Sequence, residues 1–598
     1  MTEQKPSRDT AAGWLRRVKE AERRGELLTA YDLASQALSE HPGDLALRHR
    51  AVLQLARAGA TRTAARRFAE LGLAGDAAIE DVAALAARIA KDFALAEQGA
   101  ARTHKAAEAA ALYADVHRRT GGYYPAINAA TLFLIAGQDA AARSFARAAL
   151  ENTGGTAATS EEAYFRLATE AEAHLILGDV EQGRAALARA ASVPLHDQAA
   201  FATTRRQLRL VCALRGQDPG ILAMLRAPRV IHYCGHRVAQ GRLTDADMPA
   251  LRQAVDRWLA ERDVGFGYGA LASGADITIA EALLERGAEL HVVLPFAQAE
   301  FRDVSVADGG SDWVARFDAC LARASSTSFA TEDFYLGDDS LFSYATRLAM
   351  GLAVLRAQYL DTDAEQLAIW DGLPAAGMAG TAVDVAAWRA LGRTGHIIAA
   401  PARAVAPARA PAAKAAGGRT PRAMIFGDIK GFSKLRDSEI PRFVDHILGA
   451  MARALEPHEA SILFRNTWGD GVFLVLRDSA AAALCALDLQ AAVDSLKPEA
   501  VGLPAHLGLR LGAHTGPVYS QRDPLLRRDN FFGAHVSRAA RIEPITPVGD
   551  VYVTESFAAD LALQADLPVR CDYVGHMPAA KGYGKLRMYL LRRTPAGP

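Results

Sequence analysis

The chain of 598 residues is too long for one hydrophobic core and predicts about three domains. Half of its residues are hydrophobic and 23% are charged, which is ordinary for a globular protein and excludes a largely disordered one. Lysine plus arginine and aspartate plus glutamate each total 68, so no net field attracts nucleic acid or an anionic membrane, and we expect neither as a partner.

Cysteine usage and the lack of long apolar runs predict a soluble, cytoplasmic protein. The five cysteines lie far apart and include no Cys-x-x-Cys pair, which argues against a zinc motif or a disulfide framework. The first 24 residues lack the apolar core of a secretory signal, and no stretch reaches the roughly 18 apolar residues of a membrane helix.

Residues 1–225 have the composition and spacing of packed helices. They are rich in alanine, leucine, arginine and glutamate, with apolar residues at helical intervals. Gly25 and Gly59 lie 34 residues apart, which is the tetratricopeptide period, and small residues that would let paired helices approach closely follow each of them. Gly137 and Gly178 repeat the pattern 41 residues apart, so the array is irregular.

This segment resembles a divergent tetratricopeptide-like solenoid. Such stacks expose a concave face that usually binds protein segments, so the resemblance implies a protein partner. The alternative is an alanine-rich helical bundle that has no partner.

Residues 228–400 predict a Rossmann-like α/β domain. The run VIHYCGHRV (230–238) predicts a buried strand, and a helical stretch follows from residue 244 to residue 261. The segment 265–296 predicts a glycine-rich turn, a helix and a second apolar strand, which completes a βαβ unit and implies a parallel sheet. Its glycines would let the backbone approach a phosphate, with the first N–H groups of the helix behind them.

This middle region resembles the Rossmann-like SLOG superfamily in the Gly-His-Arg after the first strand and the Ser-Gly-Ala-Asp before the helix. The resemblance implies a nucleotide or nucleotide-derived ligand, contacted by His236, Arg237, Ser273 and Asp276. A purely structural domain is the alternative, because glycine also serves close packing of a helix on a strand. A third hypothesis is hydrolysis of a nucleotide glycosidic bond by Glu281 and Asp276, although their spacing does not single them out.

Residues 401–421 are almost entirely alanine, proline, glycine and basic residues. Such a segment cannot bury a core and predicts a semi-extended linker. The boundary near Pro421 opens the last domain, residues 422–594.

Two motifs of the last domain place carboxylates together. AMIFGDIKGFSKL (423–435) predicts an apolar strand that ends at Asp428, and ILFRNTWGDGVFLVL (462–476) predicts a hairpin with Asp470 in its turn. If the hairpin lies beside the strand, the two carboxylates repel unless a cation lies between them, and oxygen ligands suit Mg²⁺ or Mn²⁺. In two-metal phosphoryl transfer one ion activates the attacking oxygen and the other holds the triphosphate.

Both motifs resemble the class III adenylate/guanylate cyclase family, and three further motifs follow in the order of that family: LGLRLGAHTGPVY (507–519), FFGAHVSRAARIE (531–543) and AAKGYGKLRMYLL (579–591). The resemblance implies a ferredoxin-like α/β domain that works as a head-to-tail homodimer, with active sites at the interface. The ribose 3′-hydroxyl of a nucleoside triphosphate would attack the α-phosphate, giving a cyclic 3′,5′-nucleotide and pyrophosphate.

The resemblance also implies roles for single residues. By motif position Asp428 and Asp470 hold two metal ions, helped by the carbonyl of Ile429. Arg541, on the helix after residue 533, would stabilise charge that develops on the α-phosphate. Ser537 stands where the family has an asparagine and would offer a weaker hydrogen bond. The alternative for Arg541 is a surface arginine.

The base-reading positions depart from the family. Adenylate cyclases of this class use a lysine and an aspartate, and guanylate cyclases commonly a glutamate and a small residue, where this chain has Asn466 and Asn530. A carboxamide both donates and accepts hydrogen bonds, so the sequence does not choose the base. The closing lysine is replaced by Tyr583, with Lys581 and Lys585 near enough to substitute.

Other polar residues of this region receive modest roles. His514 and His535 are expected to be packing or phosphate-adjacent residues, because the family mechanism needs no histidine there. Arg527, Arg528 and Asp529 are expected to form a solvated loop.

The leading hypothesis is a regulated signalling enzyme in which the solenoid takes a protein input, the middle domain takes a nucleotide input and the cyclase produces the output. The alternative is a degenerate cyclase domain that binds a nucleotide without turnover and acts as a scaffold. Asp428, Asp470 and Arg541 favour the enzyme, whereas the changed base-reading pair and closing lysine favour the scaffold.

Overall fold

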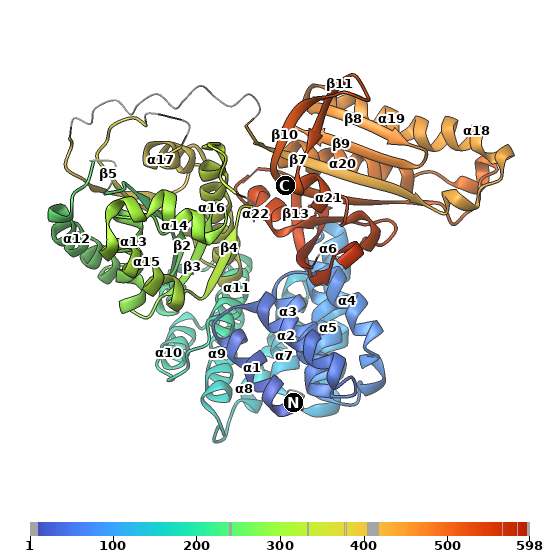
Figure 1. The fold of residues 1–598 in the computed structure, drawn as a ribbon. Helices are drawn as coiled ribbons and strands as arrows, with labels where there is room; N and C mark the ends of the chain where they lie inside the picture. Colours follow the sequence, from blue (N-terminus) through green and yellow to red (C-terminus); the bar gives the residue numbers. More distant parts are fainter. Residues whose placement is uncertain are drawn as a thin grey trace, which may run out of the picture.

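In a computed structural model the chain folds into three regions that contact one another: a helical region, a region built on a parallel sheet and a region built on a mixed sheet (Figure 1). The structure describes residues 10–238, 242–331, 334–375, 377, 379–403, 418–564, 566–582 and 584–594. None of the described helices combines the length and the apolar composition that a bilayer crossing requires.

The first region is a succession of antiparallel helices. They are α1 (Ala11–Arg23), α2 (Leu27–Glu40), α3 (Leu45–Arg57), α4 (Thr61–Glu70), α5 (Glu80–Leu95), α6 (Gly99–Thr120), α7 (Tyr123–Ile135), α8 (Asp139–Asn152), α9 (Ser160–Leu177), α10 (Val180–Ala191) and α11 (Gln198–Arg215). The predicted repeat is confirmed at its turns, because Gly25, Gly59, Gly137 and Gly178 each separate two helices of a pair with φ between 72° and 94°. A left-handed backbone of this kind favours glycine.

The middle region is a six-stranded parallel sheet in the order β4-β3-β2-β1-β5-β6, which confirms the predicted parallel α/β fold. Its elements are β1 (Arg229–Gly235), α12 (Met248–Ala260), β2 (Val264–Gly269), α13 (Ala275–Glu285), β3 (Glu289–Leu294), α14 (Gln298–Ser305), α15 (Ser311–Arg323), β4 (Ser326–Phe329), α16 (Ser340–Leu360), β5 (Ala364–Trp370), α17 (Thr381–Ala390) and β6 (Gly395–Ala399). The chain leaves β1 towards β2 and returns at β5 on its other side, so the strand order reverses there. Such a switch point is where open α/β sheets bind ligands.

The third region is a mixed sheet in the order β13-β14-β12-β10-β7-β9-β8, with β11 paired to β10. Its elements are β7 (Thr420–Lys430), α18 (Ile440–Arg442), α19 (Gly449–Leu455), β8 (Ile462–Trp468), β9 (Gly471–Leu476), α20 (Ser479–Asp494), β10 (Gly508–Asp523), β11 (Arg528–Phe532), α21 (Ala534–Ala539), β12 (Val551–Thr554), α22 (Glu555–Ala562), β13 (Val569–Pro578) and β14 (Lys585–Arg593). A π-helical segment, Phe443–Leu448, joins α18 to α19.

Three local predictions are wrong. The run of Arg528 and Asp529 is part of strand β11 rather than a loop, because a strand at the edge of a sheet tolerates charged side chains. Arg541 lies beyond the end of α21 instead of on it. Strand β7 begins at Thr420, inside the segment assigned to the linker, because Thr420 and Pro421 pair with Val518 and Pro517 of β10.

Helix α16 of the middle region joins it to the other two regions. It packs along α22, where a Cβ added to Gly351 would lie 2.2 Å from the carbonyl oxygen of Ala559. Farther along, the hydroxyl of Tyr344 donates to the carbonyl of Thr515 in β10 at 2.7 Å. One hydrophobic cluster includes buried residues of all three regions, so the three regions share a core.

Candidate active site

The structure brings Asp428 and Asp470 together in the way the sequence predicts. Asp428 lies near the end of β7, and Asp470 lies in the turn between β8 and β9, where Gly469 has a φ of 71°. Strand β7 pairs with β9 up to Gly427 and Val472, so the turn lies beside Asp428. Burial raises the pKa of the Asp470 carboxyl, and the negative charge of Asp428 raises it further.

A second pair of charged residues supports this site. Arg510 lies opposite Asp428 in the register of β10 on β7, and one of its guanidinium nitrogens donates to Asp428 Oδ2 at 2.8 Å. Its Nε forms an ion pair with Glu543, whose pKa is raised to about 7 by burial. Both residues lie within the motifs 507–519 and 531–543, but the sequence alone assigns them no role, because their contact depends on the pairing of distant strands.

The donor set fits a hard divalent cation. The carboxylates of Asp428 and Asp470 lie close together, next to the backbone of Ile429. The described residues contain no cluster of three or more histidine, cysteine, aspartate or glutamate side chains that could hold a metal by themselves. Mg²⁺ is typically bound through one or two carboxylates, with waters and substrate phosphates as its other ligands. Asp428 and Asp470 therefore fit a divalent cation of this kind.

The two asparagines at the base-reading positions are joined to the β10–β11 hairpin. Asn466 Oδ1 accepts a hydrogen bond from the guanidinium of Arg528 at 2.9 Å. Asn530 Nδ2 donates to Asp523 Oδ2 at 2.9 Å. Because Asp523 and Arg528 pair in the register of this hairpin, both carboxamides belong to one polar edge that could contact a base.

The remaining predicted residues follow β11. Ser537 is exposed on α21, and the half-buried guanidinium of Arg541 forms no ion pair with a described carboxylate. The carbonyl of Arg541 accepts from the Ala580 N–H at 3.2 Å, which ties the closing segment to it. Lys585 is exposed at the start of β14. Tyr583 lies outside the described residues, as does the side chain of Lys581, which belongs to a short 3₁₀ helix.

His514 and His535 form a buried stacked pair. Their rings lie 5.1 Å apart between centroids, and His514 Nε2 is 2.8 Å from His535 Nδ1. Burial lowers the pKa of His535 to about 3 and holds that of His514 well below its usual range. Gly516 leaves room for the pair, because a Cβ there would lie 2.1 Å from His535 Nδ1. These are packing residues.

The residues predicted to contact a ligand in the middle region lie at the end of β1. His236 follows β1 and is buried, with its Nε2 2.9 Å from Asp371 Oδ1 after the neighbouring strand β5. Arg237 instead donates to Asp308 Oδ1 at 2.6 Å, which directs its guanidinium towards the loop before α15.

Two buried polar side chains remain at the start of α13. Ser273 Oγ has no hydrogen-bond partner among the described residues. Burial raises the pKa of the Asp276 carboxyl to about 7. Both lie near the switch point of the sheet, and Asp276 Oδ1 likewise has no hydrogen-bond partner among the described residues.

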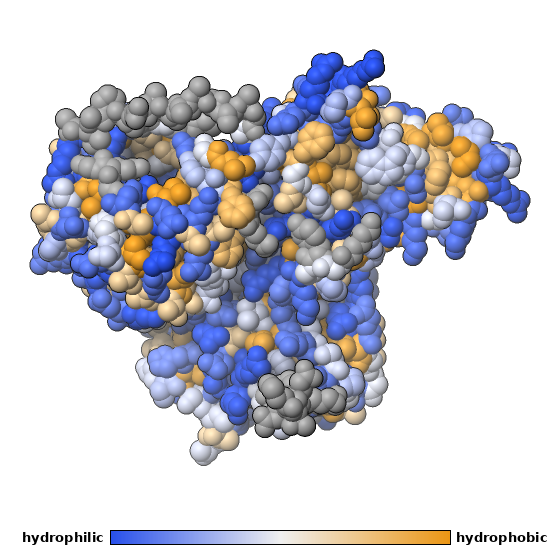
Figure 2. Space-filling model, in the orientation of Figure 1, coloured by the Kyte–Doolittle hydropathy of each residue, from blue (hydrophilic) through white to orange (hydrophobic). Residues whose placement is uncertain are grey.

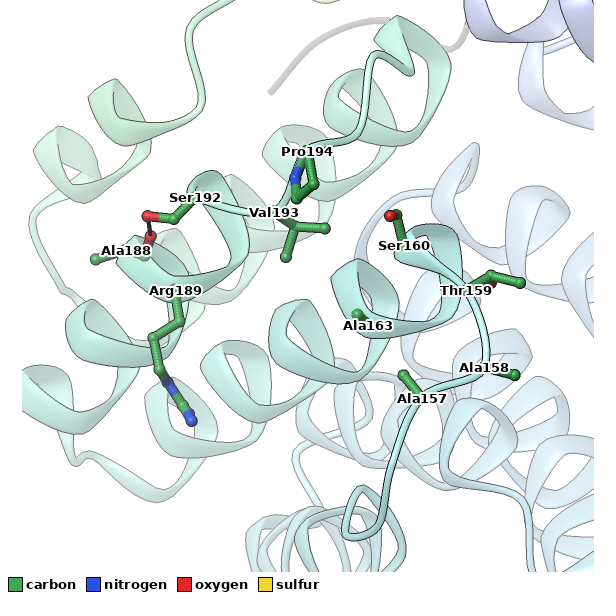
Figure 3. A pocket seen from close by; sticks show the side chains of 10 residues that line it. All are labelled: Ala157, Ala158, Thr159, Ser160, Ala163, Ala188, Arg189, Ser192, Val193 and Pro194. Carbon is green, nitrogen blue, oxygen red and sulfur yellow. Dashed lines mark hydrogen bonds between the residues drawn. The ribbon is translucent and has the colours of Figure 1, made fainter.

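A separate hollow of about 750 Å³ lies between the start of α9 and the end of α10 in the helical region (Figure 3). It is lined mostly by small residues: Ala157, Ala158, Thr159, Ser160, Ala163, Ala188, Arg189, Ser192, Val193 and Pro194. The one charged member, Arg189, extends away from Ser160 and Val193 and pairs with Glu170. The hollow therefore suits the side chains of a docked protein segment better than an anion.

Comparison with known proteins agrees with the fold of two regions. Residues 419–593 match the family described as the adenylate and guanylate cyclase catalytic domain, and residues 26–133 match Tetratricopeptide Repeats-Sensor. The third region is therefore a class III adenylate/guanylate cyclase domain, and the first carries sensor-type tetratricopeptide repeats, beside a parallel α/β domain in the middle. No curated protein matches the chain.

Several solved cyclase structures are similar to part of the chain. One is the guanylate cyclase domain of RhGC from Catenaria anguillulae in complex with GTP, with 18% identity over 29% of this chain and 97% of that one and a TM-score of 0.25. The adenylyl cyclase CyaB from P. aeruginosa has 18% identity over 30% and 99%, with a TM-score of 0.27. A non-canonical dimeric guanylyl cyclase domain from Blastocladiella emersonii has 18% identity over 29% and 97%, with a TM-score of 0.24.

Proposed function

We propose that the third region converts a nucleoside triphosphate to a cyclic 3′,5′-nucleotide and pyrophosphate. The observation that carries the proposal is the meeting of Asp428 and Asp470 at the β8–β9 turn, inside a domain that matches the cyclase catalytic family. Two Mg²⁺ or Mn²⁺ ions held by these carboxylates and the Ile429 carbonyl would supply Lewis-acid chemistry, neutralising the triphosphate and activating the 3′-hydroxyl.

The chain's own side chains prepare the site. Arg510 donates to Asp428 and fixes the orientation of its carboxylate, while Glu543 holds Arg510 from the other side. Arg541 has no carboxylate partner among the described residues, so its guanidinium is available to an anionic α-phosphate. A preorganised cation at a position where negative charge develops is worth several kcal/mol to the transition state.

We further propose that the active site is completed in a homodimer. Seven of the fourteen exposed large hydrophobic side chains among the described residues belong to the cyclase domain: Val444, Leu463, Trp468, Leu525, Leu526, Phe532 and Val548. Hydrophobic side chains gather on the face of this domain that Figure 2 shows. Exposed apolar groups of this kind mark an interaction surface, and a second copy that covers it would bring Ser537, Arg541 and Lys585 to the carboxylates of its partner.

A degenerate domain that binds a nucleotide without turnover is the second candidate. It is favoured by the two carboxamides, whose bonds to Arg528 and Asp523 leave fewer free groups for a base, and by the change of the closing lysine to Tyr583.

The other two regions are proposed to regulate the cyclase in the cytoplasm. The sensor-type repeats and the hollow between α9 and α10 support a protein partner. Ser273 and Asp276 at the switch point support a SLOG-like nucleotide site in the middle region, with His236 and Arg237 beside it. The described cysteines are all free thiols, which is typical of a reducing compartment.

The test is incubation of the purified protein with ATP, GTP, CTP or UTP and Mn²⁺, followed by mass spectrometry for cyclic monophosphates. We expect one base to predominate, and the product to be absent from Asp470→Ala but present with Asp437→Ala, a matched exposed aspartate of the same domain. Asn466→Lys combined with Asn530→Asp should shift the preference towards ATP. If none of the four substrates gave a product, the degenerate domain that binds a nucleotide without turnover would be the supported alternative.

A further inference from the structure

A cavity of about 870 Å³ lies where the three regions meet, beside the middle of α11 and the ends of α16 and α22. Figure 1 shows how these three helices are arranged. Its walls come from α3, α5 and α11 of the helical region, from the last turn of α16, and from α22, β13 and β14 of the cyclase domain. This volume is within the range of sites for small molecules and cofactors. The lining contains no residue of the β8–β9 turn or of the end of β1, so neither proposed site accounts for the cavity.

The helical region lines this junction cavity with positive charge. Arg57, Arg88, Lys91 and Arg206 face it from three helices. The only described carboxylate in the lining is Asp92, which pairs with Arg88. The wall contributed by the helices is therefore strongly basic.

The other two regions add three more cations. Arg393 belongs to the middle region, and Arg570 and Arg592 belong to the cyclase domain. The described lining thus contains seven basic side chains and one acidic one, although the formal charge of the whole chain is zero. This asymmetry is local and is contributed by all three regions.

Carboxylates behind the walls do not neutralise these cations. Each of three carboxylates in contact with the lining serves two or three arginines. The groups are Glu22 with Arg50 and Arg57, Asp361 with Arg205, Arg206 and Arg209, and Asp572 with Arg570 and Arg592. Arg393 has no close ion pair among the described residues, although the charge of Asp363 acts on it from a greater distance. The cavity retains an excess of positive charge, which is costly in a partly buried place unless an anion binds.

Lys91 is the most deeply buried cation of the described lining. Its side chain is only 6% exposed, and its ammonium donates to the neutral oxygens of Asn128 and Gln207 at 2.7 and 2.8 Å. Burial lowers its pKa to about 8. The acceptors in direct contact are amides, whereas the nearby carboxylates of Glu172 and Asp92 favour the charged form of Lys91 from a greater distance. Gln207 donates to Glu172 at 2.7 Å and so connects the ammonium to that buried carboxylate.

The same cavity has an apolar side. Leu95 and Leu210 of the helical region, Leu355 of α16, and Leu561 and Leu567 of the cyclase domain complete its lining. Basic groups on one side and leucines on another are complementary to a molecule with an aromatic body and several phosphates.

We propose that the junction cavity binds a nucleoside phosphate with at least two negative charges, as a ligand separate from the substrate of the cyclase. A mononucleotide polyphosphate and a cyclic dinucleotide share this chemistry. The phosphates lie among Lys91, Arg206, Arg393 and Arg570, and the base packs on the leucines. Because these groups come from three regions, the bound ligand holds the regions together.

Binding at the junction has a structural route to the cyclase site. Helix α22 follows β12, which pairs with β10, and β10 carries Arg510 opposite Asp428. An effect of the ligand on turnover rests on the proposed function, whereas binding does not. The test is therefore a binding experiment that needs no catalysis.

Full-length Asp470→Ala protein in EDTA is titrated by calorimetry with ATP, with a 3′,3′-linked cyclic dinucleotide and with adenosine. Metal-dependent binding at the carboxylate pair is absent under these conditions. We expect one of the two phosphate ligands to bind and adenosine not to bind. Tighter binding of ATP identifies a polyphosphate ligand, and tighter binding of the other identifies a dinucleotide.

Variants locate the site. In the same background Lys91→Gln and Arg393→Gln should each weaken binding at least about tenfold, which corresponds to one lost charge-assisted hydrogen bond. Arg389→Gln, on the same segment as Arg393 but outside the lining, should bind like its parent. Thermal unfolding of each variant checks that it is folded.

Hydrogen exchange tests whether the ligand spans the three regions. We expect the ligand to slow exchange together in α5, in the last turn of α16 and in α22. The proposal is overturned if neither phosphate ligand binds, if both cavity variants bind like Arg389→Gln, or if protection is confined to the β8–β9 turn or to the end of β1.

Discussion

The cyclase site and the junction cavity carry side chains of opposite charge. At the β8–β9 turn Asp428, Asp470 and Glu543 surround one guanidinium, Arg510. In the junction cavity seven basic side chains surround one described carboxylate. The first site therefore needs metal ions to hold a triphosphate, whereas the second carries the neutralising charge on its own side chains.

This difference explains why net charge reveals neither site. The formal net charge of the chain is zero, and it includes an acidic site and a basic site that lie in different parts of the fold. Only the local arrangement decides whether a phosphate binds directly or through a cation. A change at one of the two sites therefore leaves the other as an internal reference.

The largest effect is expected for Asp470→Ala. Removal of one of two metal-binding carboxylates should lower the rate of cyclic nucleotide formation by about 10²–10³, the scale for loss of one preorganised electrostatic group. Calorimetric binding of the phosphate ligand in EDTA should be unchanged, because the junction holds no metal-binding group from this turn. A variant that cyclises as fast as wild type would contradict the assigned site, and Asp437→Ala is the matched control.

Arg510→Gln should cause a smaller loss, about tenfold in turnover, because Arg510 positions Asp428. The informative measurement is the dependence of the turnover rate on pH. Arg510 lowers the pKa of Asp470, so its removal should move the acid limb of the profile to higher pH. Arg510→Lys keeps a positive charge and should therefore return the acid limb part of the way towards its wild-type position. A profile that falls in amplitude without moving would mean that Arg510 only stabilises the fold.

The contrast between the two predictions also shows what the sequence can predict. The Asp428–Asp470 pair follows from two apolar runs and a glycine turn that are local in sequence, and the 34-residue glycine spacing likewise predicted the helix pairs. Arg510 could be assigned only from the register of β10 on β7. The junction cavity had no local signal, because Lys91, Arg393 and Arg570 come from three regions and look like ordinary charged residues of helices and turns.

The two sites should depend on pH in opposite directions. The pKa of Asp470 is raised by burial and by Asp428, so protons compete with metal there, and the apparent affinity for Mn²⁺ should rise with pH. Lys91 has a pKa lowered to about 8 by burial, so binding of the phosphate ligand at the junction should weaken several-fold as pH rises above that value. Lys91→Gln should abolish this alkaline loss. Titrations of metal and of ligand at several pH values test both signs, and parallel slopes would contradict the comparison.

The smallest expected effect concerns the framework that joins the two sites. His514 and His535 are buried and neutral between β10 and Tyr344 of α16, with pKa values well below that of an unfolded histidine, about 6.5. Below that pH the unfolded chain takes up protons that the native pair does not, so the stability contributed by the pair is complete above about pH 6.5 and is lost as the pH falls.

His535→Asn should therefore make the free energy of unfolding less dependent on pH between about 7 and 5, by about 2 kcal/mol at the acid end. It should also lower the stability at neutral pH, since it removes a packed ring. Denaturant unfolding of wild type, His535→Asn and His446→Gln, an exposed histidine of the same domain, separates the two effects. Equal acid sensitivity in all three proteins would mean that other groups govern it.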